Sequence, residues 1–271
     1  MSLAIIDRRN NSIVSSQPVE DSQNPLILPP PDTFIWHYIR FDFLQALLKN
    51  KALWLTRLDK QSDKNDGMYS DANSHQWTPV IQKLMERSGF NIQLGKDNES
   101  QIQWTNKILR ARTFIHCWSI RAKESAWMWN AFVSGEPRSI ALRSTVGCLI
   151  TALKGQPVDI ARMLYYSSGQ ARPDWSYTAP FTAKDKEAHI HERELRVMTM
   201  LDSGASENPN HRLIPVELKK LIRKVVIHPS SPPNFRLEVR NELKAHEIPA
   251  HVAGSQLQMC DLEAAALHRP H

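Results

Sequence analysis

Apolar and polar residues alternate in short stretches that predict strands separated by short helices. Residues 34–39 are aromatic and β-branched, which is typical of a strand. Apolar residues then recur at helical spacing over residues 42–49, and residues 52–56 return to the strand pattern. The chain is therefore predicted to open with a strand, a helix and a second strand.

The same patterns predict further elements along the chain. Strands are expected at residues 113–119, 139–143, 162–166 and 195–201, and helices at 125–133, 145–153, 182–189 and 232–245. Residues 218–227 are predicted to begin as a helical turn and to end as a strand. This order favours one α+β domain, with helices inserted between the strands of a mixed or antiparallel sheet.

The two ends and one internal stretch differ from this pattern. Residues 1–30 are rich in Ser, Asn, Gln and Pro, which favours a flexible N-terminal arm. The domain is expected to span residues 31–250, with a helical insert at about 77–112. Residues 251–271 are interpreted as a C-terminal tail that contains a short Ala-rich helix.

Composition is that of an ordinary globular protein, with 41% hydrophobic and 23% charged residues. No apolar run reaches the roughly 18 residues of a membrane span, and the N-terminus has no signal-peptide pattern. The three cysteines form no CxxC pair, which favours a reduced, cytoplasmic chain without structural zinc. A net charge of +6 permits contact with a polyanion such as nucleic acid.

The chemically most distinctive stretch lies at the start of the strand near residue 195. On one continuous strand, alternation places Glu192, Glu194 and Arg196 on one face and Leu195 and Val197 on the other. Carboxylates beside an arginine suit a cationic or sugar-like group. The alternative is a solvated charged edge.

The sequence lacks the common motifs of nucleotide and metal sites. It contains no G-x-G-x-x-G and no P-loop, so a Rossmann or kinase-type site is not supported. The aspartates of residues 59–71 lack EF-hand spacing, and His189 and His191 are out of register with the two glutamates, so no metal is expected. Lys184 is expected on a helix surface.

An ordered series of motifs runs through residues 34–250. It consists of Trp-His-Tyr at 36–38, Leu-Leu-Lys-Asn-Lys-Ala-Leu-Trp at 47–54, Lys-Asn-Asp-Gly at 64–67, Cys-Trp-Ser at 117–119, Met-Trp at 128–129, Leu-Tyr-Tyr at 164–166, Lys184 and Glu-Arg-Glu-Leu-Arg at 192–196. In this order the motifs resemble a bacterial family catalogued as domain of unknown function 2971. The chain departs from that family at Gly67, where proline is usual, and in the insert at 77–112. The family itself implies no function.

The order of the parts is also similar to the ADP-ribosyltransferase fold. In that fold an early strand contacts the ribose of NAD, a middle strand supplies Ser or Tyr, and a late strand carries the catalytic glutamate. The resemblance implies that Glu194, Glu192, His37 and Ser119 are catalytic: Glu194 stabilises the oxocarbenium-like state, and Glu192 orients the acceptor or supports the ribose. It also implies the cofactor contacts: His37 hydrogen-bonds the ribose, Ser119 is the serine of the middle strand, Arg40 faces a phosphate, and Tyr38 and Trp129 stack on nicotinamide.

The resemblance thus implies an NAD-using effector, a toxin or defence protein, that acts on nucleic acid or protein. Two alternatives stay open: a non-catalytic module that binds nucleic acid or protein, and a metal-dependent nuclease. Each residue also has a structural alternative. His37 can be a half-buried strand residue, Ser119 a turn residue, and Trp129 part of the core.

Overall fold

The computed structural model describes residues 5–7, 12–14, 27–68, 107–133, 135–167, 179–201 and 209–266. The expected insert at 77–112 lies outside these residues, except that 107–112 are helical. Within the expected N-terminal arm, β1 (Ile5–Asp7) and β2 (Ser12–Val14) form an antiparallel pair.

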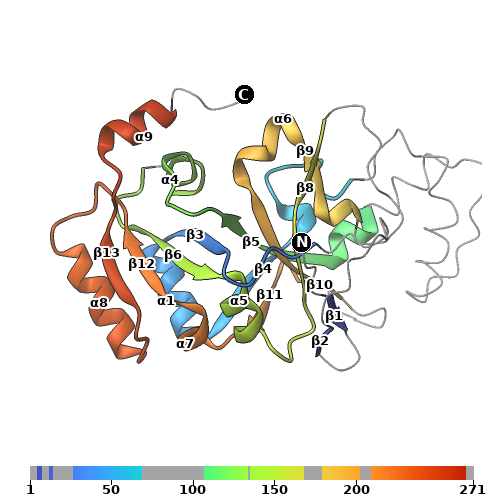
Figure 1. Cartoon of the computed structure of the whole chain (residues 1–271), viewed down its shortest axis with the longest axis horizontal. Coiled ribbons are helices and arrows are strands. Elements are labelled where there is room, and N and C mark those ends of the chain that lie inside the picture. Colours follow the sequence, from blue (N-terminus) through green and yellow to red (C-terminus); the bar gives the residue numbers. More distant parts are fainter. Residues whose placement is uncertain are drawn as a thin grey trace, which may run out of the picture.

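A nine-stranded sheet forms the centre of the described part of the chain (Figure 1). Its strands follow the order β11 (His211–Pro215), β4 (Ala52–Arg57), β5 (Thr113–Ile120), β3 (Phe34–Arg40), β6 (Ser139–Thr145), β12 (Lys224–Ile227) and β13 (His251–Gly254), and β10 (Glu194–Met200) joins β5 to β7 (Asp159–Arg162). All neighbours are antiparallel except β12 and β13, which are parallel. The predicted α+β class with a mixed sheet is confirmed.

Helices cover both faces of this sheet. The helices are α1 (Phe41–Asn50), α5 (Val146–Ala152), α7 (Leu218–Leu221) and α8 (Phe235–Ala245), which lie below the sheet in Figure 1, and α4 (Ala126–Val133), α6 (Lys186–His189) and α9 (Met259–Ala266), which lie above it. The lower face carries the larger apolar cluster, with Leu195 and Val197 of β10 in it. The upper face carries a smaller one around Trp36 and Trp129.

The region before β10 differs from its prediction. The expected helix at 182–189 is instead a single turn, η3 (Ala179–Thr182), followed by β9 (Ala183–Asp185) and the short α6. The expected strand at 162–166 is divided into β7 and β8 (Leu164–Tyr166), and β8 pairs in parallel with β9. Burial of Ala183 and Lys184 beside β8 overrides the helical preference of this stretch.

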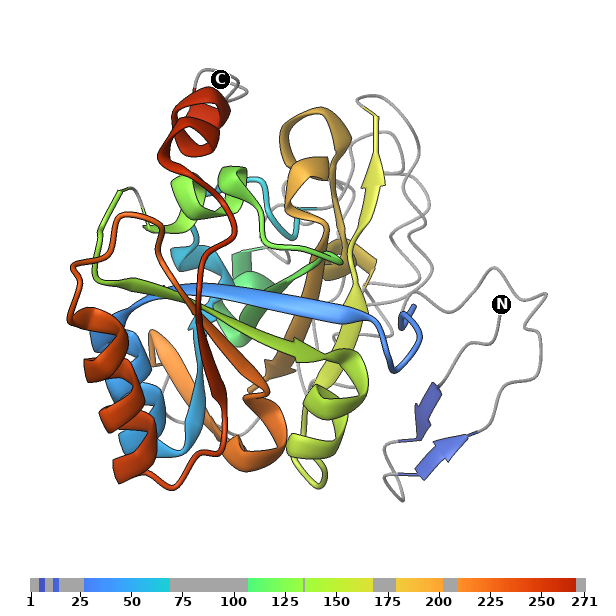
Figure 2. The ribbon, with the colours of Figure 1, turned by 60° about the vertical axis from the view of Figure 1, so that its left-hand side comes forward.

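The domain extends beyond the expected limits of 31 and 250. Leu28 belongs to the core, and the carbonyl of Ile27 accepts a hydrogen bond from Arg162 N at 2.8 Å. At the other end, β13 adds a strand to the sheet, and Figure 2 shows the chain leading from it into α9 at the top. Leu262 of α9 packs into the upper cluster, so residues 251–266 are part of the domain.

One edge of β5 is shared by two strands, and this divides the sheet. β3 pairs with Ser119 and Ile120, while β4 pairs with Phe114 and Ile115. Between them, the Nδ1 of His37 donates to the Cys117 carbonyl at 2.9 Å, and the Nδ1 of His116 donates to the Trp54 carbonyl at 3.1 Å. Two imidazoles therefore bridge the place where β3 and β4 diverge.

Candidate active site

Two adjoining cavities open beside this division of the sheet. Cavity A, of about 220 Å³, lies between an acidic wall (Asp63, Asp66, Lys184, His189, Glu192 and Glu194) and an aromatic wall (Trp36, Tyr38, Trp127 and Phe132). Cavity B, of about 330 Å³, lies on the α1 side and is lined by Arg40, Phe43, Trp54, His116 and Leu213, among others. His37, Cys117 and Phe132 line both. Together the cavities reach the size range of small-molecule sites.

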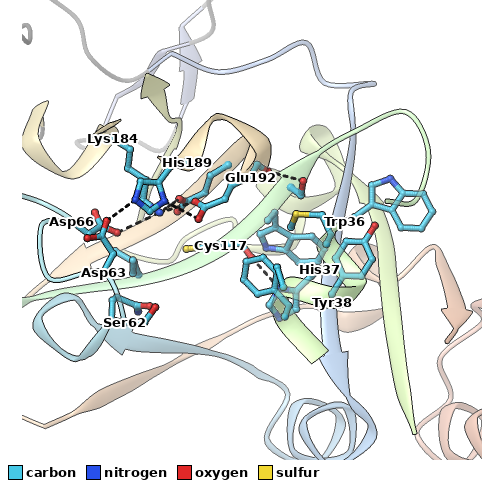
Figure 3. Close-up of a pocket in the computed structure, with 18 of the residues that line it drawn as sticks. Trp36, His37, Tyr38, Ser62, Asp63, Asp66, Cys117, Lys184, His189 and Glu192 are labelled. Atoms are coloured by element: carbon cyan, nitrogen blue, oxygen red, sulfur yellow. Dashed lines mark hydrogen bonds and ion pairs between the residues drawn. The ribbon is translucent and has the colours of Figure 1, made fainter. Parts of the chain in front are cut away.

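The acidic wall is built on a buried ion cluster (Figure 3). Lys184 Nζ lies 2.8 Å from Glu192 Oε2, 2.9 Å from Glu194 Oε2 and 3.6 Å from Asp66 Oδ2. Arg196 donates to both carboxylate oxygens of Asp66, at 2.9 and 2.8 Å, and to both of Glu194, at 2.7 and 3.1 Å. Since each cation meets at least two carboxylates, the cluster connects the loop at 58–68, β9 and β10.

The charges in this cluster are stabilised by one another. Glu194 is 2% exposed, and burial alone would raise the pKa of its carboxyl. The nearby charges of Arg196 and Lys184 outweigh burial and hold that pKa well below its ordinary value. Burial would likewise lower the pKa of Lys184, but Glu194 and then Asp66 raise it above its ordinary value. Glu194 and Lys184 are therefore both ionised.

Glu192 is the more accessible of the two glutamates, with 19% of its side chain exposed. Its Oε1 lies 3.1 Å from His189 Nδ1, and His189 Nε2 lies 3.1 Å from Asp63 Oδ2. The hydrogen bonds to Asp63 and then to Glu192 raise the pKa of His189 to about 9, and the bond from His189 lowers the pKa of Asp63 to about 2. His189 is therefore an imidazolium between two carboxylates.

A tightly held turn presents Glu192 to cavity A. Glu192 ends the single turn η4 (Ile190–Glu192), and Arg193 adopts the left-handed region, with φ of 45°, before β10 begins. Ser119 Oγ donates to the Glu192 carbonyl at 2.7 Å, and Arg121 donates to Ser119 Oγ at 3.2 Å and to the His191 carbonyl. The predicted alternation of Glu194 and Arg196 is confirmed, whereas Glu192 lies outside the strand and reaches the same face from this turn.

The proposed NAD-contacting residues fall into different surroundings. His37 lines both cavities, and burial, followed by the neighbouring His116, lowers its pKa well below the ordinary value. Tyr38 is buried, although it lines both cavities, and its hydroxyl oxygen accepts a hydrogen bond from Ser125 N at 2.9 Å. Arg40 is exposed beside cavity B and pairs with Asp42 at 2.9 Å. His37 is thus a neutral group at the junction of the cavities.

Two expectations about side-chain position are corrected. Trp129 is 0% exposed, donates from Nε1 to Glu124 Oε2 at 3.2 Å, and lines neither cavity, so its ring packs in the core. Trp127 of the same helix lines cavity A instead. Lys184 lies on β9 and is only 8% exposed, which places it in the ion cluster and not on a helix surface.

Asp63, Asp66 and His189 were not predicted to be parts of one site. The spacing of His189 and Glu192 was a usable signal, because residues three apart on a helical turn meet side by side. No comparable signal joins Asp66 to Arg196, which are 130 positions apart. Among the residues described, no group of three or more His, Cys, Asp or Glu side chains is arranged to hold a metal ion. Every helix in the described ranges is also too short or too polar to span a membrane.

Comparison with known proteins gives weak likenesses only. No protein-family model and no curated protein matches the chain, so the resemblance to domain of unknown function 2971 stays a prediction. Solved structures of Thermus sp. 2.9 DarT are similar to it. The complex with ADP-ribosylated ssDNA has a TM-score of 0.40 at 12% identity over 85% of this chain and 98% of that chain. The complex with NAD+ has a TM-score of 0.37 at 11% identity over 84% and 98%. At these scores the function rests on the chain's own residues.

Proposed function

We propose that the chain is an ADP-ribosyltransferase-like enzyme that uses NAD as donor. The observation that carries the proposal is the position of a partly exposed carboxylate, Glu192, across cavity A from aromatic side chains. In the proposed reaction the bond between nicotinamide and ribose breaks and nicotinamide leaves with the electron pair. The ribose carbon then bonds the acceptor nucleophile, whose proton passes to Glu192 or to water. A carboxylate near the developing positive charge would contribute roughly 3–4 kcal/mol.

Glu192 suits the catalytic role better than Glu194. Both oxygens of Glu194 are hydrogen-bonded to Arg196, one of them also meets Lys184, and the side chain is almost wholly buried. Glu192 keeps an exposed portion that lines cavity A. We therefore assign Glu192 to stabilising the developing positive charge. Glu194 is assigned to holding Lys184 and Arg196 in place.

The other groups that line the cavities fit the parts of NAD. Trp127 and Phe132 offer aromatic surface for the nicotinamide ring, and the neutral His37 can hydrogen-bond a ribose hydroxyl. Arg40 is the one Lys or Arg among the described residues that line cavity B. Its ion pair with Asp42 is exposed and therefore weak, so the guanidinium can turn to a phosphate.

Cavity B favours a nucleic acid as the acceptor. Phe43, Trp54 and Leu213 are exposed along it, and Trp54 stacks on His211 with ring centroids 3.6 Å apart. Exposed aromatic rings are platforms for unpaired bases. The Nε2 of His116, which lines cavity B, is buried and has no hydrogen-bond partner among the described residues. The likeness to DarT solved with ADP-ribosylated ssDNA points the same way but is too weak to carry this step.

The ion cluster disfavours a metal-dependent nuclease. In such an enzyme a divalent cation would lie among the carboxylates. Here Lys184 lies among Asp66, Glu192 and Glu194, and Arg196 neutralises Asp66 and Glu194 from the other side. The protein's own cations thus take the position that a metal would need.

Nicotinamide release from NAD by the purified chain tests the proposal, with and without single-stranded DNA or RNA. We expect Glu192→Gln to lower the rate by about 10²–10³-fold, as for loss of one transition-state partner, with the fold intact. Glu247→Gln is the matched control because Glu247 is exposed and pairs with Lys219 away from both cavities. Absence of NAD consumption under all conditions would refute the proposal and favour a non-catalytic binding module.

A further inference from the structure

His189 joins two parts of the chain that are far apart in sequence. Its Nδ1 bonds Glu192 on the turn before β10, and its Nε2 bonds Asp63 in the loop at 58–68, each at 3.1 Å. Asp63 is itself fixed in that loop, because its Oδ1 accepts a hydrogen bond from Asn65 N at 2.8 Å. The imidazole therefore connects the loop at 58–68 to the Glu192 carboxylate within the acidic wall of cavity A (Figure 3).

This bridge needs the charged form of the ring. Carboxylates only accept hydrogen bonds, and a neutral imidazole donates from one nitrogen only, so two carboxylate partners require both nitrogens to be protonated. The charged groups that face His189 are Asp63 from the loop and Glu192 from η4, which attract it, and Lys184 from β9, which repels it. On β8, which packs against α6, the Tyr165 hydroxyl is engaged with Glu194 N.

We propose that His189 is a positioning residue: as an imidazolium it holds the Glu192 carboxylate toward cavity A and ties it to the loop at 58–68, and on losing its proton it releases one of the two. The link between loop and turn is independent of the reaction, whereas its effect on turnover rests on the proposed function. Glu192 Oε2 stays bonded to Lys184 when the bridge opens, so the change is confined to Oε1 and the loop.

The bridge makes the site sensitive to alkaline pH. The pKa of His189 is about 9 in the folded chain, above the ordinary value of 6.5. A raised folded pKa means that the contribution to stability is fully present below about pH 6.5 and is lost as the pH rises through about 9. Nicotinamide release should therefore fall on the alkaline side with a midpoint near this pKa.

The first test uses no NAD. In the ligand-free protein the imidazole NMR signal of His189, assigned by its absence in His189→Gln, should titrate near 9. The melting temperature of wild type should exceed that of His189→Gln by a constant margin up to about pH 6.5 and approach it above about pH 9. The control His246→Gln removes a histidine that also pairs with a carboxylate, Glu242, but on α8 and away from the cavities. A titration near 6.5, or a melting difference that does not change with pH, would overturn the bridge.

The second test measures nicotinamide release against pH. We expect His189→Gln to lower kcat at least about tenfold below pH 8, as for loss of a transition-state interaction, and to remove the alkaline limb. His189→Arg, which keeps the charge and several donors, should restore part of kcat and shift the limb upward. If His189→Gln released nicotinamide with the same dependence on pH as the wild type, the positioning role would be refuted. If no variant and no wild type releases nicotinamide, the proposed function fails, and the first test still decides whether the bridge exists.

Discussion

Replacement of Glu194 by glutamine tests whether the buried ion cluster holds the domain together. The change keeps the shape of the side chain but removes a charge that contacts Arg196 twice and Lys184 once. One amide oxygen can still accept from Arg196, while the amide NH2 now faces another donor. Breaking a buried ion pair costs about 3–5 kcal/mol.

The balance of positive and negative charges in the cluster determines how large this loss of stability should be. The connected groups are four carboxylates (Asp63, Asp66, Glu192 and Glu194) and three cations (Lys184, His189 and Arg196). Removal of one negative charge leaves equal numbers of each sign, so we expect the lower end, about 3 kcal/mol. For a domain of this size that corresponds to a fall in Tm of roughly 6–12 °C.

Thermal unfolding followed by circular dichroism at several pH values measures the effect. Because the folded pKa of Glu194 lies below its unfolded value, its contribution to stability is present above about pH 4–5 and is lost as the pH falls further. The difference in Tm should therefore be constant at neutral pH and shrink in acid. An unchanged Tm at pH 7 would refute a structural role for Glu194 and return it to the list of catalytic candidates.

Four further substitutions test two glycine positions, one helix end and the ion cluster. Gly67→Ala should cost about 2–3 kcal/mol, because φ is +76° and the added Cβ would lie 2.6 Å from Leu58 Cδ2. Gly135→Ala, at φ +74° with nothing within 4 Å of the added Cβ, should lower the free energy of unfolding by about 1 kcal/mol. If urea unfolding gave equal losses for Gly67→Ala and Gly135→Ala, the contact with Leu58 would be easily relieved. Lys51→Gly should stabilise the protein by about 0.5 kcal/mol, because Lys51 ends α1 at φ 49°, and a lower Tm would contradict this. Lys184→Met should cost about 3–5 kcal/mol by leaving buried carboxylates unpaired, and an unchanged urea midpoint would contradict this.

Local pattern was sufficient for most elements that lie in the described residues. The strand, helix and strand at the start of the domain, the strand β5 and the helices α4, α5 and α8 were all predicted close to their observed bounds. The period of two in β10 correctly placed Glu194 and Arg196 on one face. These features depend on neighbours within a few residues, whose spacing is visible in the sequence.

Burial of that charged face could not be read from local pattern. Alternation left open a solvated charged edge at β10, but α4, α6 and the loop at 58–68 lie over the sheet on that side. Glu194 and Arg196 are consequently buried, and Asp66 and Lys184 compensate their charges. A charged pair in water and the same pair in a core have the same sequence signature.

The chain alone thus determined its class, most of its elements and the residues that form the acidic strand. Only the tertiary structure decided which glutamate stays accessible, that Trp129 packs in the core while Trp127 lines the cavity, and that β3 and β4 diverge along β5. The physical reason is distance along the chain. Local preferences act over a few residues, whereas ionisation and access at this site also depend on Asp63 and Asp66, which folding brings beside His189 and Lys184 from a distant part of the chain.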